Sequence, residues 1–325
     1  MIQVEGIVKR FGMVTAVDKV SFSIAKGEVV GFLGPNGAGK TTTMRILTCF
    51  LPADEGQAKV AGFDVFEQSL DVRNHIGYLP ENAPLYLDMA VDDFLNYVAT
   101  IRGIKGPDRT KALARISDVC GLSSVMKKQV GELSKGFKQR VGLAQAMIHN
   151  PEILILDEPT SGLDPNQIRE IRGLIKMLGE EKTVILSTHI LSEVEATCGR
   201  VIIIDRGKIA ADGSMEAIIK RARGQNLHVI LVRGEPAKIE AGLKTIADVV
   251  SSRLVEKENG LLKYEILARE GVHLGEQIFR MAADHGLSLA ELRREKTSLE
   301  TVFRDLTQAA DSGAEAEEEE ESAEE

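Results

Sequence analysis

The sequence predicts an α/β fold over roughly the first two thirds of its 325 residues, followed by a smaller α+β domain. Two observations support the α/β assignment. Short apolar runs of the kind that form buried parallel strands occur at Val29–Leu33, Ile153–Leu156 and Thr183–Ser187. Glycine-rich or acidic segments follow the first two runs directly, and α/β folds place their chemistry at the carboxyl ends of such strands. A site is therefore expected at these strand ends.

A glycine-rich loop joins the first strand to a helix. The segment GPNGAGKTT fits the pattern GxxxxGK[ST] and stands between Val29–Leu33 and the helix-like Thr42–Cys49. Glycines let backbone N–H groups surround phosphate oxygens, and the helix N-terminus adds partial positive charge. We expect Lys40 to reach the β- and γ-phosphates and the Thr41 hydroxyl to bind Mg²⁺. An ordinary glycine-rich turn is the alternative. The expected nucleotide-binding residues here are Gly34, Asn36, Gly37, Ala38, Gly39, Lys40, Thr41 and Thr42.

Two carboxylates and a histidine follow the other two strands. Asp157 is expected to hold Mg²⁺, through water, and Glu158 to polarise the water that attacks the γ-phosphate. His189 comes after Thr183–Ser187 and is a candidate for contact with the γ-phosphate or with that water, although a lone histidine is more often structural. The predicted catalytic residues are therefore Glu158, His189 and Lys40.

In this order the segments resemble the ATP-binding subunit of an ABC transporter over about residues 1–220. The resemblance rests on the glycine-rich loop, on LSKGFKQ at Leu133–Gln139 in place of the family's LSGGQ signature, and on the Asp157–Glu158 pair. It also rests on SGLD at Ser161–Asp164 and on His189 in STH. The resemblance implies a phosphate-loop ATPase with a mixed-sheet core and a helical subdomain.

In the family, two such subunits bind head to tail, and each ATP lies between the phosphate loop of one and the signature of the other. The resemblance implies that Ser134, Lys135 and Gly136 contact the nucleotide bound across that interface. It implies that Asp164 carries signals between the two sites. Phe11 matches the position whose ring stacks on adenine, with simple packing as the alternative.

Two positions depart from the family pattern in charge. Glu81 stands where the family has a Gln that links Mg²⁺ and water to the membrane partner, and Lys135 stands where the signature has Gly. Glu81 is accordingly expected at the nucleotide and the metal. The opposite charges suggest that Glu81 of one subunit meets Lys135 of the other, with a coupling of roughly 1–4 kcal/mol. The alternative is two exposed loop side chains that never meet.

A helical insert interrupts the α/β pattern at about residues 82–150. Val91–Ile101 and Asp108–Cys120 are expected to form helices, separated by a breaker at Gly103–Pro107. By resemblance, the surface of this subdomain and the Glu81 loop grip a cytoplasmic helix of a membrane-spanning partner.

The family pattern ends near residue 223, and a second domain is expected over residues 224–308. Its segments read β-α-β-β-α-β and close with a helix at Ser298–Leu306, which suits a small ferredoxin-like fold. A regulatory or dimer-stabilising role and a packing-only role both stay open. Residues 309–325 are expected to be a disordered tail, because they hold nine acidic residues and no basic ones.

Composition favours a cytosolic protein of two domains. Hydrophobic residues make up 43% of the chain, and no run approaches the roughly 20 apolar residues of a transmembrane helix. Met1 leads straight into a strand-like segment, so no signal peptide is expected. Cys49, Cys120 and Cys198 are isolated and are expected to be reduced packing residues. Removing the nine tail acids from the total of 49 leaves 40, equal to the 40 Lys and Arg, which argues against nucleic-acid binding.

Two functions remain from the sequence. The first is the Mg²⁺-dependent, ATP-hydrolysing, energy-coupling subunit of an exporter, most similar to bacterial type 2 ABC exporters such as multidrug and gliding-motility-associated systems. It pairs with a second copy of itself or a homologous ATPase subunit, and it binds integral membrane permease subunits at the cytoplasmic face of the cell membrane. The alternative is a soluble ABC-type mechanical ATPase acting on ribosomes or DNA. Such proteins usually carry two ATPase units or a long coiled coil, and neither is predicted here.

Overall fold

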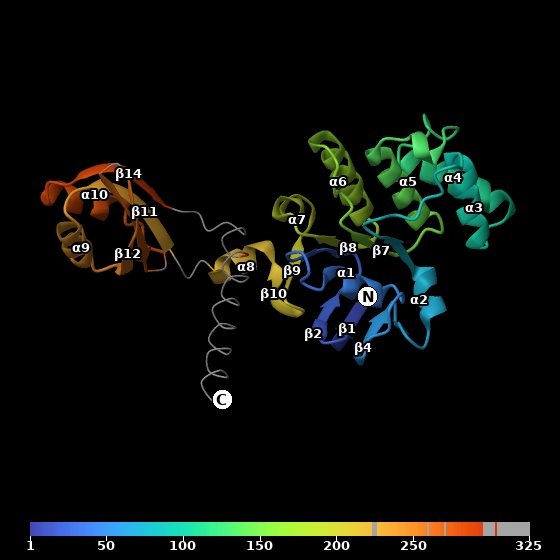
Figure 1. The fold of residues 1–325 in the computed structure, drawn as a ribbon, viewed down its shortest axis with the longest axis horizontal. Coiled ribbons are helices and arrows are strands. Elements are labelled where there is room, and N and C mark those ends of the chain that lie inside the picture. Colours follow the sequence, from blue (N-terminus) through green and yellow to red (C-terminus); the bar gives the residue numbers. More distant parts are fainter. Residues whose placement is uncertain (223–225, 259, 270, 295–302, 304–325) are drawn as a thin grey trace. The chain divides into compact units, whose positions relative to one another are not determined.

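The computed structural model describes residues 1–222, 226–258, 260–269, 271–294 and 303 (Figure 1). The chain divides into two compact units, Met1–Met215 and Glu216–Glu325. The ranges 1–223 and 224–308 stay predictions, and the acidic tail at 309–325 lies outside the described residues. Among the helices of the described residues, none is long and apolar enough to cross a membrane.

A six-stranded mixed sheet forms the centre of the first unit, which confirms the expected mixed-sheet core. The strand order is β10-β9-β3-β8-β7-β6, and the pairings among the inner strands are parallel. Every residue of β7 and β8 is buried, as the apolar runs predict. The edge strand β10 is antiparallel to β9. The strands are β3 (Val29–Leu33), β6 (Ile76–Leu79), β7 (Ile153–Asp157), β8 (Thr183–Thr188), β9 (Arg200–Asp205) and β10 (Lys208–Ser214).

A second, antiparallel sheet has the order β2-β1-β4-β5. Helix α1 (Lys40–Leu47) contacts strands of both sheets, and one apolar core fills the space around it. Phe22 of this sheet packs against Phe32 of the central sheet, with ring centroids 5.6 Å apart. This packing fixes the loop before α1 between the two sheets. The strands are β1 (Ile2–Phe11), β2 (Val14–Ile24), β4 (Glu55–Val60) and β5 (Phe63–Asp64).

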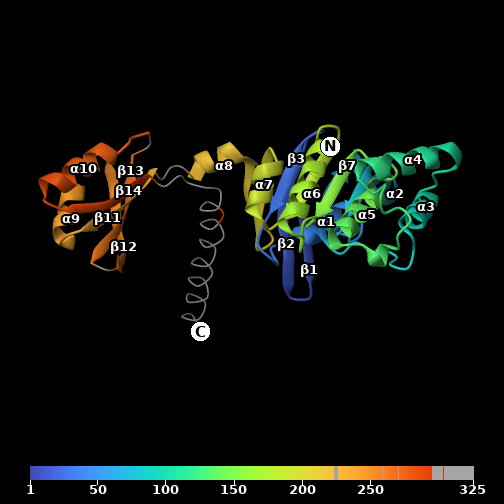
Figure 2. The same ribbon diagram turned by 90° about the horizontal axis from the view of Figure 1, so that it is seen from above.

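The helical insert forms as expected and lies at one end of the first unit (Figure 2). Helix α3 spans Val91–Ile101, and α4 spans Gly106–Val119. Pro107 was expected in the breaker but lies in the first turn of α4, where a missing N–H costs nothing. The other helices of this unit are α2 (Ser69–His75), the 3-10 turn η1 (Val130–Glu132), α5 (Lys135–Met147), α6 (Pro165–Gly179), α7 (Leu191–Thr197) and the start of α8 (Met215–Ala222).

The second unit has the predicted β-α-β-β-α-β order. Its antiparallel sheet has the order β12-β13-β11-β14, the ferredoxin-like arrangement, and an apolar core includes residues of α9, α10 and the sheet. The closing helix expected at Ser298–Leu306 lies, apart from residue 303, outside the described residues. The elements are β11 (Asn226–Arg233), α9 (Pro236–Lys244), β12 (Val249–Glu258), β13 (Leu261–Ala268), α10 (Gly275–Asp284) and β14 (Ser288–Arg294).

Candidate active site

The glycine-rich loop between β3 and α1 has a backbone that only glycine accommodates at two of its positions. A Cβ on Gly34 would lie 2.3 Å from the backbone oxygen of Ile204, and one on Gly39 would lie 2.4 Å from that of Ala16. Gly39 also has φ 103°, a conformation that residues with a Cβ rarely adopt. Gly207 donates a backbone hydrogen bond of 3.0 Å to Ala38 from the turn after β9. The loop is therefore held in one shape by neighbouring strands.

A cavity of about 460 Å³ opens over this loop. It collects nine of the predicted site residues at one place, which are Asn36, Gly37, Gly39, Lys40, Thr41, Thr42, Glu81, Glu158 and His189. Ala16 of β2 and Ser161 also line it, and neither was predicted as a site residue. Ser161 could have been found because it opens the SGLD segment. Ala16 carries no sequence signal, because only the packing of the second sheet brings it here.

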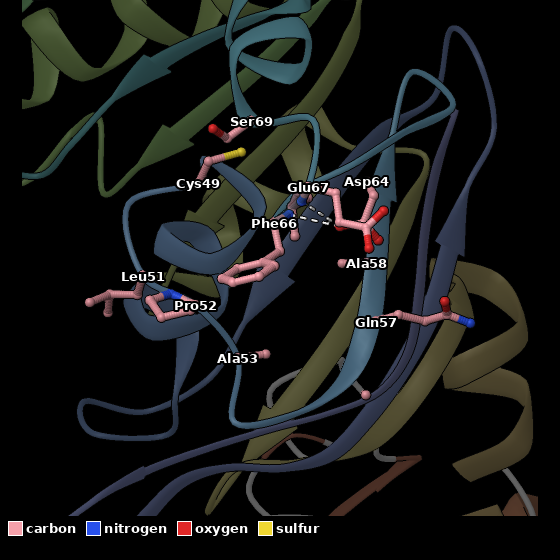
Figure 3. Close-up of a pocket in the computed structure, with 12 residues that line it drawn as sticks. Cys49, Leu51, Pro52, Ala53, Gln57, Ala58, Asp64, Phe66, Glu67 and Ser69 are labelled. Atoms are coloured by element: carbon pink, nitrogen blue, oxygen red, sulfur yellow. Dashed lines mark hydrogen bonds between the residues drawn. The ribbon is translucent and has the colours of Figure 1, made fainter.

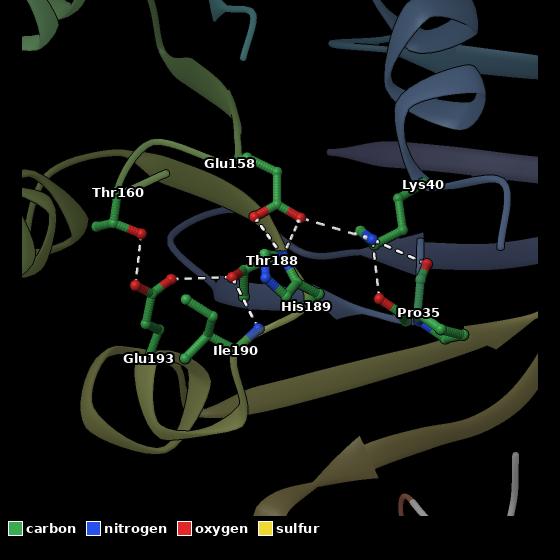
Figure 4. Close-up of polar contacts among 9 residues, drawn as sticks. Pro35, Lys40, Glu158, Thr160, Thr188, His189, Ile190 and Glu193 are labelled. Carbon is green, nitrogen blue, oxygen red and sulfur yellow. Dashed lines mark hydrogen bonds and ion pairs between the residues drawn. The ribbon is translucent and has the colours of Figure 1, made fainter. Parts of the chain in front are cut away.

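Lys40, Glu158 and His189 form one network in this cavity (Figure 4). The Nζ atom of Lys40 donates hydrogen bonds to the backbone oxygens of Gly34 at 2.8 Å and Pro35 at 3.1 Å. It also lies 3.5 Å from Oε1 of Glu158. Nδ1 of His189 lies 3.0 and 2.9 Å from the two carboxylate oxygens of Glu158, so Nδ1 is the ring atom that donates. The ammonium group of Lys40 is thus held between two carbonyls and a carboxylate. An anion that entered the cavity would find this positive charge in position to bind it.

The backbone of Glu158 is itself unusual. Its φ is 48°, in the left-handed region that is unfavourable for a residue with a long side chain. A hydrogen bond of 2.9 Å from its N–H to the backbone oxygen of Ser187 holds it there. Glu158 is only 7% exposed, so its carboxylate faces the cavity and little bulk water. Strained residues of this kind concentrate at functional sites.

Asp157 lies beneath the cavity and is completely buried. Neither of its carboxylate oxygens has a well-formed hydrogen bond among the described residues, although the hydroxyls of Ser187 and Thr41 are near enough to lower its pKa. Burial is the larger effect and raises that pKa, and nearby Glu81 adds to the rise. A buried carboxylate without a well-formed hydrogen bond is costly, and a divalent cation would satisfy it. The donor set of Asp157, Thr41 and Glu81 therefore fits Mg²⁺, which prefers oxygen ligands.

The signature residues lie elsewhere in the same chain. Ser134 is the N-cap of α5, and its hydroxyl accepts a hydrogen bond of 3.4 Å from Phe137 N. A Cβ on Gly162 would lie 2.1 Å from Nζ of Lys135, so this lysine extends over the SGLD segment of its own chain. Buried Gly136 packs against Gln167 of α6. Ser134, Lys135 and Gly136 do not line the cavity over the phosphate loop.

Two further predicted residues also lie outside the lining of the cavity. Asp164 caps α6 by accepting hydrogen bonds from the backbone N–H groups of Asn166 at 2.9 Å and Gln167 at 3.0 Å. Phe11 ends β1 with 49% of its surface exposed, and Nζ of Lys9 lies 5.8 Å from the centre of its ring. An exposed ring beside a cation is free to stack on a planar ligand.

Another cavity, of about 500 Å³, lies beside Cys49 and Phe66 (Figure 3). It contains none of the predicted site residues. The carboxylate of Asp64 in its lining accepts hydrogen bonds from the backbone N–H groups of Phe66 at 2.8 Å and Glu67 at 3.1 Å. This carboxylate closes a local turn, so its chemistry is already used within the fold.

Comparison with known proteins agrees with this geometry. Residues 17–161 match the family model described as "ABC transporter", and residues 129–195 also match one described as "AAA domain, putative AbiEii toxin, Type IV TA system". The chain is 32% identical to the linearmycin resistance ATP-binding protein LnrL of Bacillus subtilis, over 94% of this chain and 98% of that protein. It is 33% identical to the bacitracin transport ATP-binding protein BcrA of Bacillus licheniformis, over 93% and 96%.

A solved structure gives the same result for the fold. The dimeric structure of a bacterial ABC transporter cassette aligns with a TM-score of 0.61 and 25% identity, over 66% of this chain and 98% of that one. The part of the chain that it covers corresponds in extent to the first unit. The chain belongs to the ABC transporter family, as an ATP-binding subunit that hydrolyses ATP.

Proposed function

We propose that this chain drives export through separate membrane-spanning subunits, as one of two ATP-binding subunits that bind head to tail at the cytoplasmic face of the cell membrane. One observation carries the proposal. The cavity gathers the phosphate loop with Glu158 and His189, whereas the signature residues Ser134 to Gly136 lie outside it in the same chain. A second subunit is needed to bring a signature to the nucleotide. The names of LnrL and BcrA, which refer to linearmycin resistance and bacitracin transport, support export of a toxic compound.

Each polar group in the cavity has a proposed task in hydrolysis. Mg²⁺ held by Asp157, Thr41 and Glu81 would neutralise charge on the phosphates. Lys40 lies 3.5 Å from Glu158 and would turn to the more strongly charged phosphate when ATP enters. Without the lysine beside it, Oε1 of Glu158 can accept a proton from the attacking water. Nδ1 of His189 lies within hydrogen-bond distance of both carboxylate oxygens and keeps the carboxylate in place.

Replacing the proposed base tests this mechanism. Glu158→Gln keeps the size of the side chain and removes its basicity, so turnover should fall by roughly 10²–10⁴. Binding of ATP should persist, and the dimer should accumulate because hydrolysis no longer reopens it. Glu195→Gln, an exposed glutamate on α7, is the matched control. Near-normal turnover in Glu158→Gln would refute the assignment.

A groove of about 450 Å³ is the proposed contact with the membrane-spanning partner. It is lined by three arginines, Arg45, Arg73 and Arg102, together with Phe50 and Tyr78. Among the described residues, none of these guanidinium groups forms an ion pair with a carboxylate. Burial, and then the charge of Arg73, lower the pKa of Arg102. We propose that the bound segment of the permease presents a carboxylate to these arginines.

The partner experiment is a pull-down of tagged Glu158→Gln protein with ATP from gently solubilised native membranes. A stoichiometric membrane protein with several spanning helices supports the proposal. Ribosomal or chromosomal proteins without such a chain would contradict it and favour a soluble mechanical ATPase. Added to the Glu158→Gln bait, Arg73→Glu should abolish capture of the membrane chain. In the otherwise wild-type chain, Arg73→Glu should leave ATP hydrolysis by the isolated subunit intact. Lys111→Glu reverses an exposed charge on α4 outside the groove and should retain capture.

A further inference from the structure

A buried carboxylate lies behind the catalytic network. Glu193, in the first turn of α7, is 1% exposed. It accepts a short hydrogen bond from the hydroxyl of Thr160 and one of 2.9 Å from the hydroxyl of Thr188 (Figure 4). Among the side chains described in residues 1–218, no cation lies at ion-pair distance from it. Burying a carboxylate without a cation is costly, so these two hydrogen bonds carry much of its compensation.

The two hydroxyls belong to the two loops that carry the catalytic pair. Thr160 is two residues after Glu158, and Thr188 immediately precedes His189. The hydroxyl of Thr188 also accepts a hydrogen bond of 3.1 Å from the N–H of Ile190, so it closes the turn around His189. Glu193 therefore connects a point beside Glu158 to a point beside His189.

The sheet does not make this connection. The parallel pairing of β7 with β8 ends at Asp157 and Ser187, and the two chains then leave the sheet. Beyond that point three contacts join the loops. One is the backbone hydrogen bond from the N–H of Glu158 to the oxygen of Ser187, and another is the Glu158–His189 contact in the cavity. The last is the pair of hydrogen bonds that buried Glu193 accepts from Thr160 and Thr188. The surroundings of the Glu158–His189 contact change during the reaction, because the Glu158 carboxylate must exchange Lys40 for water. The Glu193 contacts are buried and do not involve the reacting groups.

We infer that Glu193 is a positioning residue for hydrolysis, which keeps Glu158 and His189 in register while ATP draws Lys40 away. Its two hydrogen bonds join Thr160 to Thr188 through a side chain, beyond the point where backbone pairing between β7 and β8 ends. The inference rests on the proposed catalytic roles of Glu158 and His189. A shift of about 1 Å between these loops would separate base and histidine, and misplacement on this scale costs about 10²-fold in rate.

Glu193→Gln in the full chain is the direct test. The amide has one acceptor oxygen, and its NH₂ group can only donate, so one of the two threonine hydroxyls must turn from donor to acceptor, which replaces a hydrogen bond to a charged carboxylate by a weaker neutral one. We expect kcat to fall about 10- to 100-fold, while KM for ATP changes less than about threefold, because the phosphate loop is untouched. Glu195→Gln on the exposed side of the same helix should leave both constants unchanged.

A double-mutant cycle separates positioning from simple structural support. If Glu193 acts through His189, Glu193→Gln should lower single-turnover rates less than about threefold in the His189→Ala background. A merely structural residue would lower the rate by the same factor in both backgrounds. Should Glu193→Gln fail to fold, Thr160→Val removes one of the two hydroxyls at nearly constant volume and should lower kcat at least about 10-fold. Thr160→Ser keeps the hydroxyl and should have the kcat of the wild type.

The outcomes distinguish this inference from the proposed function. If Glu158→Gln and His189→Ala alone retain normal turnover, the assignment of the catalytic pair fails. If those variants are impaired but folded Glu193→Gln and Thr160→Val keep kcat within about twofold of wild type, only the positioning role is overturned. Multiplicative losses in the cycle would overturn it as well.

Discussion

His149 should make folding sensitive to mild acid. It follows α5, and its Nε2 atom lies 2.9 Å from the backbone oxygen of Ile76, at the start of β6. Burial, followed by the charge of Arg102, lowers its pKa from 6.5 to about 4, and Lys182 and Arg115 act in the same direction. A second proton would place a donor at Nδ1, which is buried and has no hydrogen-bond partner among the described residues.

The sign and size of the effect follow from these values. The unfolded chain binds a proton at His149 below about pH 6.5, whereas the folded protein does so only near pH 4. The unfolded state therefore binds more protons in this window, and stability falls as the pH falls through it. A fully shielded group would lose about 1.4 kcal/mol per pH unit, so about 2 kcal/mol between pH 6.5 and pH 5 is the upper bound. Because the side chain keeps some contact with solvent, we expect about 1 kcal/mol.

The assay compares the free energy of unfolding in urea, followed by circular dichroism, near pH 7.5 and near pH 5. His149→Gln retains an N–H donor for Ile76 but does not titrate, so its stability should fall about 1 kcal/mol less than that of the wild type. Carboxylates titrate in both proteins, so their contribution to the change in the free energy of unfolding cancels when the two proteins are compared. His75→Gln replaces another histidine bonded to a backbone oxygen and is the matched control. Equal losses in wild type and His149→Gln would refute the reasoning.

Three further predictions concern the nucleotide site. Gly39→Ala should weaken ATP binding at least about 10-fold, measured by equilibrium titration with a fluorescent ATP analogue, because its Cβ would collide with the backbone of Ala16. Gly199→Ala has open space around its Cβ and should bind normally. If Glu81 and Lys135 meet across the dimer, ATPase rates of Glu81→Gln, Lys135→Gly and the double variant should be non-additive, and strict additivity would contradict the contact. Chelation of Mg²⁺ should abolish turnover and excess Mg²⁺ should restore it, whereas turnover with chelator present would exclude the proposed metal site.

Much of this protein could be predicted from local sequence because its key segments are continuous. The phosphate loop and the apolar strand that leads to Asp157 and Glu158 depend on neighbouring residues alone. The β-α-β-β-α-β order of the second unit was also predictable, since each strand and helix has its own period. The start of α4 was misplaced because Pro107 suits either a breaker or a first helical turn.

Other features required the tertiary structure. Ala16 reaches the nucleotide cavity because β2 packs over the phosphate loop, and Glu193 reaches Thr160 because β7 and β8 are neighbours in the sheet. Neither residue belongs to a motif used to predict the site. The pattern of residue types determined which groups could bind phosphate, hold a metal or accept a proton. Only the folded chain decided which buried groups meet, because such contacts join residues far apart in sequence through packing and through hydrogen bonds that burial makes obligatory.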